Sequence, residues 1–447
     1  MKAVIKRGVM IPRLDYEQKH CSLLIAHCSL LTAHCSLIIL ICAAFLSCGN
    51  NNIAVLWSDR PEFAFYGEYF NSTQDQYKVE TRYYDYPALK LADVFGKSGS
   101  KSESPDIVAG SWLKSASTRV YFKPLNSYFK DKNPEKDAFY SRLLSMGNID
   151  GKQYLLPVSF NAPMVIFAGD KADLISNPFT VDFNEMKKLG KSYNAETRGI
   201  YTRMGFSPVW DDDFLFVAAT LLNVSFREAE PLAWDTLALE RAMDFIFEWI
   251  HEANSGIQAV DDFTFKYYYN PPAKLALSGR ILFAYMDSDD FFTLAEDQRN
   301  RLDFRWLAQR NTIPLNERSV YLGLVKEGRA PKAAEAFLRW FFNPETQRGL
   351  LEKNIQFRIQ ETSFGIAGGF SAMRPVTEQV LPQFYPDLLR HMPPQDFLSP
   401  ANILPSNWMT LKERVVLPWL HDRARQPNNN GIIPLERRLA DWQRLNR

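Results

Sequence analysis

The positions of the cysteines restrict how this chain can fold, because all of them lie close to the N-terminus. They are Cys21, Cys28, Cys35, Cys42 and Cys48. Residues 49–447 contain no cysteine, so no disulfide can stabilise them and their stability has to come from a buried apolar core. The chain is 46% hydrophobic and 23% charged, which is the composition of a globular protein, and its length allows two or three domains.

The last cysteine closes a segment with the features of an export signal. Residues 37–47, LIILICAAFLS, have the length of a signal-peptide hydrophobic region and end in small residues. A leader that ends in Phe-Leu-Ser-Cys resembles the lipobox of bacterial lipoproteins, although Leu is more usual at the position of Phe45. The resemblance implies that residues 1–47 are removed and that a lipid on Cys48 anchors an exported body to the membrane.

Two other interpretations of the leader remain open. Residues 21–48 could span a bilayer as an uncleaved signal anchor, although His27 and His34 interrupt the stretch, or the leader could be cleaved as a plain secretory signal. The sequence His-Cys-Ser-Leu-Leu begins at residues 20 and 27 and recurs as His-Cys-Ser-Leu-Ile at residue 34. A metal site is one explanation of this repeat. A tandem duplication, with a true start further downstream, is the simpler one.

Charge and histidine content exclude several classes of function. Residues 1–47 hold five of the 52 basic and two of the 51 acidic residues, which leaves 47 and 49 in the remainder. This near-neutral balance offers no electrostatic surface for nucleic acid. The remainder keeps only His251, His391 and His421, which are far apart in sequence and have no cysteine to help them bind zinc or copper. We therefore expect no metal, no cofactor and no nucleic-acid partner.

The common enzyme motifs are also missing. The chain has no H-E-x-x-H, no G-x-S-x-G, no P-loop and no G-x-G-x-x-G after a strand. An exported carbohydrate-active enzyme remains open as an alternative, because a glycosidase needs only two carboxylates.

Apolar strands and helices alternate along the body. Expected strands cover residues 53–57, 77–84 and 105–112, with helices from about Pro61 and over 87–95 between them. Later helices are expected over 179–193, 234–253 and 331–342, from Asn343, and over 434–445, with a further strand that ends at Met286. Such alternation predicts mostly parallel sheets flanked by helices, with ligands at the carboxyl ends of the strands.

Residues 151–167, GKQYLLPVSFNAPMVIF, are extended and twice interrupted by proline, as expected for a chain that crosses between two lobes. The order of segments resembles that of an extracellular solute-binding protein of an ABC transporter, in the sugar-binding class that includes the maltose-binding protein. The segments that carry this resemblance are IAVLWSD, SPDIVAGSW, FKPLNSYF, DGKQYLLPVSFNAPMVIF, SGRILFAYM and KAAEAFLRWFFNPETQ. The residues Phe167-Ala-Gly-Asp170 depart from it, because the family usually has an aromatic-Asn-Lys turn there.

The resemblance implies an α/β fold of the type II periplasmic-binding-protein kind. Two lobes, each a mostly parallel sheet with flanking helices, would be hinged by crossing segments and close on a solute. Mapping the segments gives lobe one as residues 53–160 plus 287–327, and lobe two as 161–286 plus 328–447. The implied function is that of a lipid-anchored, monomeric receptor which is not an enzyme. It would bind a sugar or oligosaccharide and deliver it to the membrane permeases of an ABC importer. A surface adhesin or sensor with the same fold is the other alternative.

Ligand residues are expected at strand ends that face the cleft, where aromatic rings can cover a sugar and polar side chains can bond its hydroxyls. They are Trp57, Ser58, Asp59, Ser111, Trp112, Asn161, Trp210, Asp211, Asp287, Ser288, Phe370 and Trp408. The resemblance favours Trp112, Trp210 and Trp408. The acidic triplet 211–213 could instead bind calcium, although such a triplet is more commonly a solvated turn or a helix start.

Overall fold

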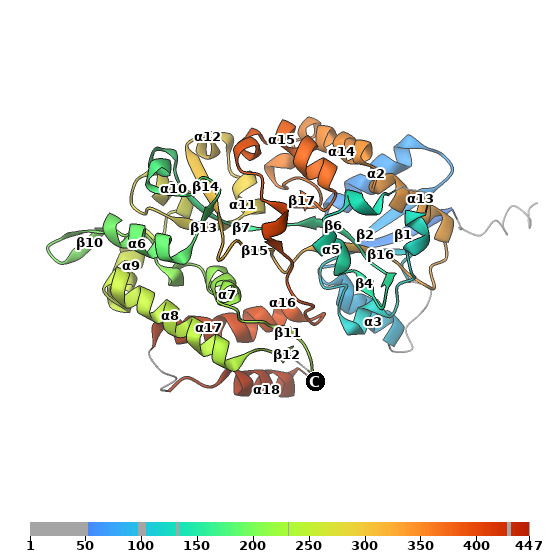
Figure 1. Ribbon diagram of the computed structural model, residues 1–447. Coiled ribbons are helices and arrows are strands. Elements are labelled where there is room, and N and C mark those ends of the chain that lie inside the picture. The colour runs from blue at the N-terminus through green and yellow to red at the C-terminus, as the bar shows by residue number, and fades with distance from the viewer. Residues whose placement is uncertain (1–51, 97–103, 131–133, 231, 427–430, 447) are drawn as a thin grey trace, which may run out of the picture. The chain divides into compact units, whose positions relative to one another are not determined.

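The computed structural model describes residues 52–96, 104–130, 134–230, 232–426 and 431–446 (Figure 1). The leader and Cys48 lie outside these ranges, so what the sequence predicts for them stays a prediction. Within the same ranges, no helix combines the length and the apolar character that crossing a membrane requires.

The larger sheet has six strands in the order β17-β6-β16-β3-β1-β2. Their bounds are β1 (Ile53–Ser58), β2 (Lys78–Tyr83), β3 (Ile107–Gly110), β6 (Leu156–Phe160), β16 (Val320–Leu324) and β17 (Phe370–Ser371). The helices that pack on it are α2 (Glu62–Thr73), α3 (Pro87–Gly96) and α13 (Pro331–Phe341), and α14 (Pro344–Gln356) packs against α13. We call this sheet and its helices the first lobe.

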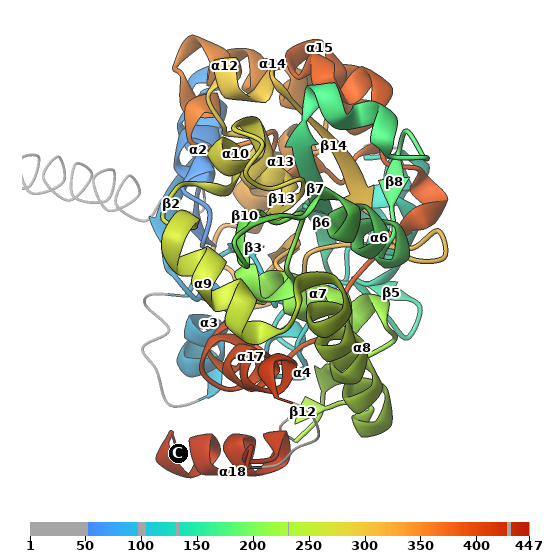
Figure 2. The same ribbon diagram turned by 90° about the vertical axis from the view of Figure 1, so that its left-hand side faces the viewer.

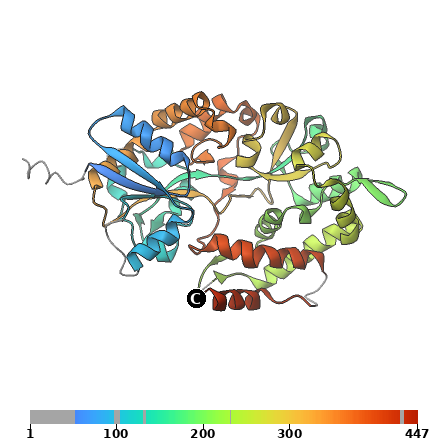
Figure 3. The same cartoon turned by 180° about the vertical axis from the view of Figure 1, so that it is seen from behind.

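The smaller sheet has four strands in the order β13-β7-β14-β8. Their bounds are β7 (Pro163–Ala168), β8 (Thr180–Val181), β13 (Ala284–Asp287) and β14 (Leu302–Leu307). With it belong α6 (Phe183–Tyr193), α7 (Asp212–Leu221), α8 (Thr236–Asn254), α9 (Ile257–Tyr267), α10 (Pro272–Leu277) and α17 (Leu417–Arg425), which packs against α7 and α8 (Figures 2 and 3). We call this group the second lobe.

The remaining α-helices and β-strands of the described residues are mostly short. They are α4 (Ala116–Arg119), α5 (Ser141–Ser145), α11 (Ser288–Phe292), α12 (Glu296–Arg299), α15 (Leu381–Phe384), α16 (Trp408–Leu411) and α18 (Leu435–Leu445), with β4 (Asn148–Ile149), β5 (Lys152–Gln153), β9 (Ala195–Thr197), β10 (Ile200–Arg203), β11 (Arg227–Glu228), β12 (Leu232–Ala233), β15 (Ile313–Pro314) and β18 (Leu398–Ser399).

The strand pairing is mixed, which corrects the expectation of mostly parallel sheets. In the larger sheet β1 is parallel to β2 and β3, but β16 is antiparallel to β3 and β6. In the smaller sheet β7 is antiparallel to β13 and β14. The reason is that β16 begins beside the end of β3, and β7 begins beside the end of β13, so each pair runs in opposite directions.

Strand pairing and helix packing also correct the expected lobe boundaries. The strand β14 lies in the segment 287–327 assigned to lobe one, yet it pairs with β7 and β8 of the second lobe. The segment 328–447 was assigned to lobe two, yet Phe341 of α13 packs against Phe63 of α2, and β17 pairs with β6. A hydrophobic pattern identifies a strand or helix but not the sheet that it joins, because both sheets bury the same kind of apolar face.

Some helices begin at a side chain that caps their first turn. The side chain of Asn343 accepts a hydrogen bond from the backbone N–H of Glu345 at 2.9 Å, directly before Pro344 opens α14. The carboxylate of Asp235 likewise accepts from the N–H of Ala238 at 2.8 Å and starts α8. These caps satisfy N–H groups that the first turn of a helix leaves without an acceptor.

Candidate functional site

Several predicted ligand residues gather where the two sheets meet edge to edge. β1, β3 and β6 end at the same edge of the larger sheet, because β1 is parallel to β3 while β16 is antiparallel to both β3 and β6. The chain passes from that edge into the smaller sheet between Phe160 and Pro163, and Pro163 pairs with Asp287 at the end of β13. We call the segments at this meeting line, residues 58–60, 111–112, 161–162, 287–290 and 316–318, the junction.

Two predicted residues, Asn161 and Ser288, join residues 161–162 to the start of α11 by hydrogen bonds. The hydroxyl of Ser288 donates to Asn161 Oδ1 at 2.7 Å and accepts from the backbone N–H of Ala162 at 3.1 Å. Asn161 Nδ2 donates to the carbonyl of Gly368 at 2.7 Å. Because these polar groups bond to one another and to Gly368, Asn161 and Ser288 hold the segment that crosses between the sheets in place.

At the ends of β1 and β3 a carboxylate is only partly bonded. Asp59 Oδ2 accepts from the backbone N–H of Ser111 at 3.1 Å, while Oδ1 has no hydrogen-bond partner and lies 3.6 Å from Arg60 Nε. The hydroxyls of Ser58 and Ser111 already bond to the protein. Ser58 Oγ accepts from the backbone N–H of Arg60 at 3.0 Å, and Ser111 Oγ donates to the carbonyl of Arg318 at 3.0 Å. Burial raises the pKa of Asp59, although the Arg60 charge opposes this.

Arg318 reaches from the start of β16 toward a buried carboxylate of the second lobe. Its Nη2 lies 3.5 Å from Asp287 Oδ2, which also accepts from Asn316 Nδ2 at 2.5 Å, and the hydroxyl of Tyr285 donates to Oδ1 at 3.0 Å. Asp287 is 5% exposed. Burial raises its pKa to about 7, the charge of Asp289 adds to the shift, and Arg318 opposes it.

The acidic triplet does not form a metal site, because its members have separate partners. Asp211 caps α7 by accepting from the N–H of Phe214 at 3.0 Å, Asp212 Oδ1 lies 2.9 Å from His421 Nδ1, and Asp213 Oδ1 lies 2.6 Å from Lys412 Nζ. Burial raises the pKa of Asp211 to about 6, with a further contribution from Asp213. Across the described residues, no group of three or more His, Cys, Asp or Glu could hold a metal ion.

Lys412 links the second lobe to the junction. Its ammonium binds Glu317 as well as Asp213 and lies 4.6 Å from the centre of the Phe216 ring. Its side chain is 8% exposed. Burial alone would lower the pKa of Lys412, but the negative charges of Glu317 and Asp213 raise it by more, so the ammonium stays charged.

Three of the predicted tryptophans have a buried indole N–H with no hydrogen-bond acceptor: Trp57, Trp112 and Trp408. A buried donor without a partner costs about 1–3 kcal/mol. Trp112 also has a φ of 57°, a left-handed conformation that is rare for a bulky residue and is found at functional sites more often than elsewhere. It lies two residues after the end of β3, at the junction, and is 6% exposed. Trp408, by contrast, is fully buried between the rings of Phe216 and Phe226.

Two predicted aromatics pack on other rings, to different extents. Phe370 is fully buried and contacts the rings of Phe160 and Phe364, with centroid separations of 5.6 Å and 4.9 Å, so its surroundings do not support the expected ligand role. Trp210 stacks on Phe263 at 5.6 Å, and its Nε1 donates to Thr264 Oγ1 at 3.1 Å. Because Trp210 is only half-buried, its expected contact with a ligand stays a prediction.

The sequence interpretation missed the charged side chains at the junction and one exposed ring. Arg60, Arg318 and Lys412 were not among the expected residues, although Arg60 directly follows Asp59. Tyr83 ends β2 beside Ser58 of β1 and is 57% exposed. Its position at the end of a predicted strand could have identified it, whereas nothing in the local sequence indicates that Arg318 and Lys412 lie near the same carboxylates.

Two cavities lie outside the predicted ligand residues. One of about 400 Å³ lies between α7, residues 314–317 and residues 399–404. The other, of about 520 Å³, is lined by residues that include Ser115, Glu228 and Ser406, and we call this region the rim. At the rim, Glu228 of the second lobe accepts from the hydroxyl of Ser115 at 2.5 Å and from the N–H of Ala116 at 2.9 Å, which joins it to the start of α4 in the first lobe. The two lobes therefore touch at the rim in this structure.

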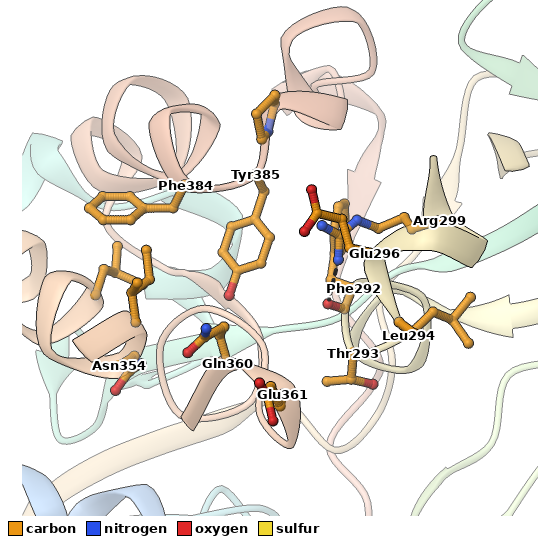
Figure 4. Close-up of a pocket in the computed structure, with 14 residues that line it drawn as sticks. Phe292, Thr293, Leu294, Glu296, Arg299, Asn354, Gln360, Glu361, Phe384 and Tyr385 are labelled. Carbon is orange, nitrogen blue, oxygen red and sulfur yellow. Dashed lines mark hydrogen bonds between the residues drawn. The ribbon is translucent and has the colours of Figure 1, made fainter. Parts of the chain in front are cut away.

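A cavity of about 680 Å³ lies elsewhere, among α11, α12, α14 and α15 (Figure 4). Figure 4 shows the rings of Phe384 and Tyr385 on one side and Gln360 and Glu361 on another. Arg299, its one lining cation, already binds Asp387 Oδ2 at 2.9 Å. None of the predicted ligand residues lines this cavity or the two described before it. We place the candidate site at the junction because buried polar groups without partners, those of Asp59 and Trp112, lie there.

Comparison with known proteins gives an independent view of the chain. Residues 66–360, more than half of its length, match the family model of the bacterial extracellular solute-binding proteins. Among curated proteins no match was found.

Solved structures share the fold. An ABC substrate-binding protein of Listeria monocytogenes in complex with cycloalternan is 14% identical, with a TM-score of 0.56, and the match covers 88% of this chain and 97% of that one. The sugar-binding protein MalE of Xanthomonas citri is 12% identical, with a TM-score of 0.58 and coverage of 88% and 96%. A sugar transporter protein of Rhizobium etli, in an open conformation, is 12% identical, with a TM-score of 0.59 and coverage of 87% and 98%.

Proposed function

Because the chain belongs to the bacterial extracellular solute-binding proteins and has their two-lobe, type II periplasmic-binding fold, we propose that it binds a sugar or oligosaccharide at the junction. The proteins of similar fold that bind cycloalternan or sugars support this choice of solute. Membrane permeases of an ABC importer would receive the solute from it. The family consists of binding proteins rather than enzymes, and we infer that this chain, acting as a monomer, catalyses no reaction.

One observation carries the placement of the site: Trp112 has both a strained backbone and an unpartnered indole N–H at the junction. A sugar offers what this side chain lacks, because its hydroxyl and ring oxygens accept hydrogen bonds and its C–H face packs on an aromatic ring. The polar groups of Asp59 and Arg60 lie at the ends of the neighbouring strand and can bond further hydroxyls.

Replacing Trp112 by phenylalanine is expected to weaken solute binding about tenfold, which corresponds to about 1.4 kcal/mol and to the loss of one buried hydrogen bond. The solute would first be identified by thermal-shift screening of the purified protein against a carbohydrate panel, and its affinity then measured by titration calorimetry. Trp340→Phe is the matched control, because Trp340 packs on Tyr69 and Phe70 in the first lobe, away from the junction. Equal affinities for the wild type and Trp112→Phe would contradict the proposed site.

We also propose that a lipid on Cys48 anchors the exported body. Cys48→Ala is expected to move the protein from the membrane to the soluble fraction without changing its affinity for the solute, since Cys48 precedes all described residues. Fractionation of cells followed by immunodetection measures this. Retention of the variant in the membrane fraction would argue for an uncleaved signal anchor instead.

A further inference from the structure

The cavity of about 680 Å³ has no part in the proposed function. It lies at the far end of α11 from the junction, because Ser288 begins that helix at the junction and Phe292, at its other end, lines the cavity. Its other walls come from α12, α14, residues 360–361 and the end of α15 (Figure 4). We call it the α11 cavity. Its volume lies within the range of small-molecule sites in proteins, about 300–1,000 Å³.

One part of the wall of the α11 cavity is apolar. Leu351 and Ile355 of α14 and the rings of Phe384 and Tyr385 contribute to it. The Tyr385 ring packs on that of Phe292 at a centroid separation of 5.4 Å. Phe384 is half-buried and stacks on no other ring among the described residues. It can therefore pack on the C–H face of an occupant, as aromatic rings do with sugars.

Two amide oxygens of the wall lack a hydrogen-bond donor, Asn354 Oδ1 and Gln360 Oε1. Asn354 is 2% exposed, and its Nδ2 donates to the carbonyl of Gly365 at 3.3 Å, which fixes the amide and leaves Oδ1 without a partner. Burial raises the pKa of the neighbouring Tyr66, and the Asn354 amide opposes the rise, as a hydrogen-bond donor does. Buried polar atoms without partners are rare and costly, so these two indicate an occupant that donates hydrogen bonds.

The same cavity also has a donor without an acceptor. Arg299 Nε donates to Asp387 Oδ2 at 2.9 Å and Nη1 donates to the carbonyl of Phe292 at 3.2 Å, but Nη2 makes no hydrogen bond within the described part of the chain. The charges are mostly balanced, since Asp387 pairs with Arg299 and Arg358 pairs with Glu361 at 2.7 Å. Figure 4 shows Arg299 and Phe384 on different sides of the cavity. An occupant therefore has to accept hydrogen bonds as well as donate them.

We propose that the α11 cavity binds a neutral mono- or disaccharide and is a second carbohydrate site, separate from the junction. Each sugar hydroxyl is both a donor and an acceptor, so it can donate to the oxygens of Asn354 and Gln360 and accept from Arg299 Nη2. A carboxylate or phosphate could not donate to the amide oxygens, and an ammonium could not accept from the arginine. The inference does not require that the solute occupies the junction.

Ile355 reports occupancy directly, because it lines the cavity and is 48% exposed. Maltose, cellobiose and mannobiose would each be titrated into protein with ¹³C-labelled isoleucine methyl groups and followed by NMR, with Ile355→Val used to assign the signal. At least one of these sugars is expected to shift the Ile355 signal in a saturable manner. The signal of Ile200, 53% exposed on β10, should not move. Absence of a saturable Ile355 shift with all three sugars would overturn the inference.

Variants connect the shift to the groups that line the cavity. Phe384→Ala is expected to weaken binding about tenfold and Gln360→Leu about fivefold, because they remove the ring and one acceptor. The Gln360 side chain makes no hydrogen bond within the described residues, so its variant keeps the test valid if Phe384→Ala folds poorly. Phe265→Ala and Gln258→Leu, at exposed positions of α9, are the matched controls. Unchanged affinity in both cavity variants would contradict the site.

Charged sugars test the neutral character of the ligand. Glu296 also lines the cavity, is exposed and makes no ion pair within the described residues, so a cationic sugar is the alternative to be excluded. Glucosamine and glucuronate would be compared with glucose through the Ile355 signal. Tighter binding of either charged sugar than of glucose would overturn the inference.

The two sites can fail separately. Trp112→Phe is expected to leave the Ile355 titration unchanged, and a tenfold loss there would show a single site and overturn the inference. An Ile355 response that depends on Phe384 and Gln360, together with no effect of Trp112→Phe on any sugar affinity, would contradict the proposed function and leave the inference standing.

Discussion

Replacing Phe370 by alanine is expected to lower the free energy of unfolding by about 3–5 kcal/mol, the usual cost of removing a buried phenylalanine ring. Phe370 is fully buried, and its ring centre lies 4.9 Å from that of Phe364 and 5.9 Å from that of Trp306. Trp306 belongs to the smaller sheet, so the cavity left by the ring would open between the two lobes. Denaturant unfolding of the purified protein, followed by tryptophan fluorescence, measures the change.

Phe265→Ala is the matched control, because that ring is 92% exposed and its loss should change stability by less than about 0.5 kcal/mol. The comparison also decides between two roles for Phe370. If Phe370→Ala unfolds like the wild type but no longer binds solute, the expectation from sequence that this ring contacts the ligand would be restored, and its assignment to the core would be wrong.

Replacing Arg318 by methionine is expected to destabilise the protein by about 2–3 kcal/mol at pH 8, because it leaves the buried carboxylate of Asp287 without its cation. This is less than the loss for a fully buried pair, since the Arg318 side chain is 37% exposed and solvent screens part of the attraction.

The loss should depend on pH in a definite direction. Burial already raises the pKa of Asp287 to about 7, above its unfolded value of about 3.8, so folding takes up a proton and this group's contribution to stability falls as pH rises from about 4 to 7. Arg318 opposes that rise, so its removal raises the pKa of Asp287 further. At pH 5 Asp287 is protonated with or without Arg318, and the variant should approach the wild type in stability.

Two controls complete this experiment. Arg82→Met removes an exposed pair with Glu80 and should cost less than about 1 kcal/mol, without pH dependence between 5 and 8. The double variant Arg318→Met, Asp287→Asn should recover part of the stability lost at pH 8, because it removes the uncompensated charge. A loss in Arg318→Met that is equal at pH 5 and pH 8 would show that packing, and not charge, explains the role of Arg318.

The sequence predicted local structure well and tertiary partners poorly. The strand at 53–57, the helix over 234–253 and the cap at Asn343 depend on side chains a few residues apart, and the structure has all three. The assignment of β14 and α13 to a lobe failed, because pairing across more than a hundred residues leaves no trace in a hydrophobic pattern.

The same lack of information on contacts between distant residues explains which site residues the sequence predicted and which it missed. Asp59, Ser111, Asn161 and Asp287 were expected because they follow strands, and the structure brings their segments to one edge. Arg318 and Lys412 were missed, since only the folded chain brings them to the carboxylates that they bind. Phe370 offers no free ring, because residue type does not tell on which side an aromatic packs.

If Trp112 binds the solute as proposed, it affects stability and affinity in opposite directions. Its left-handed backbone and its unpartnered N–H together withhold a few kcal/mol that a better-satisfied residue would return to the empty fold. An occupant that accepts from Nε1 recovers the second part of that free energy as binding, which adds to the thermal stability of the loaded protein by mass action. On the proposed binding mode, the protein without solute has a lower stability than its core could support, and the difference adds to the free energy of binding.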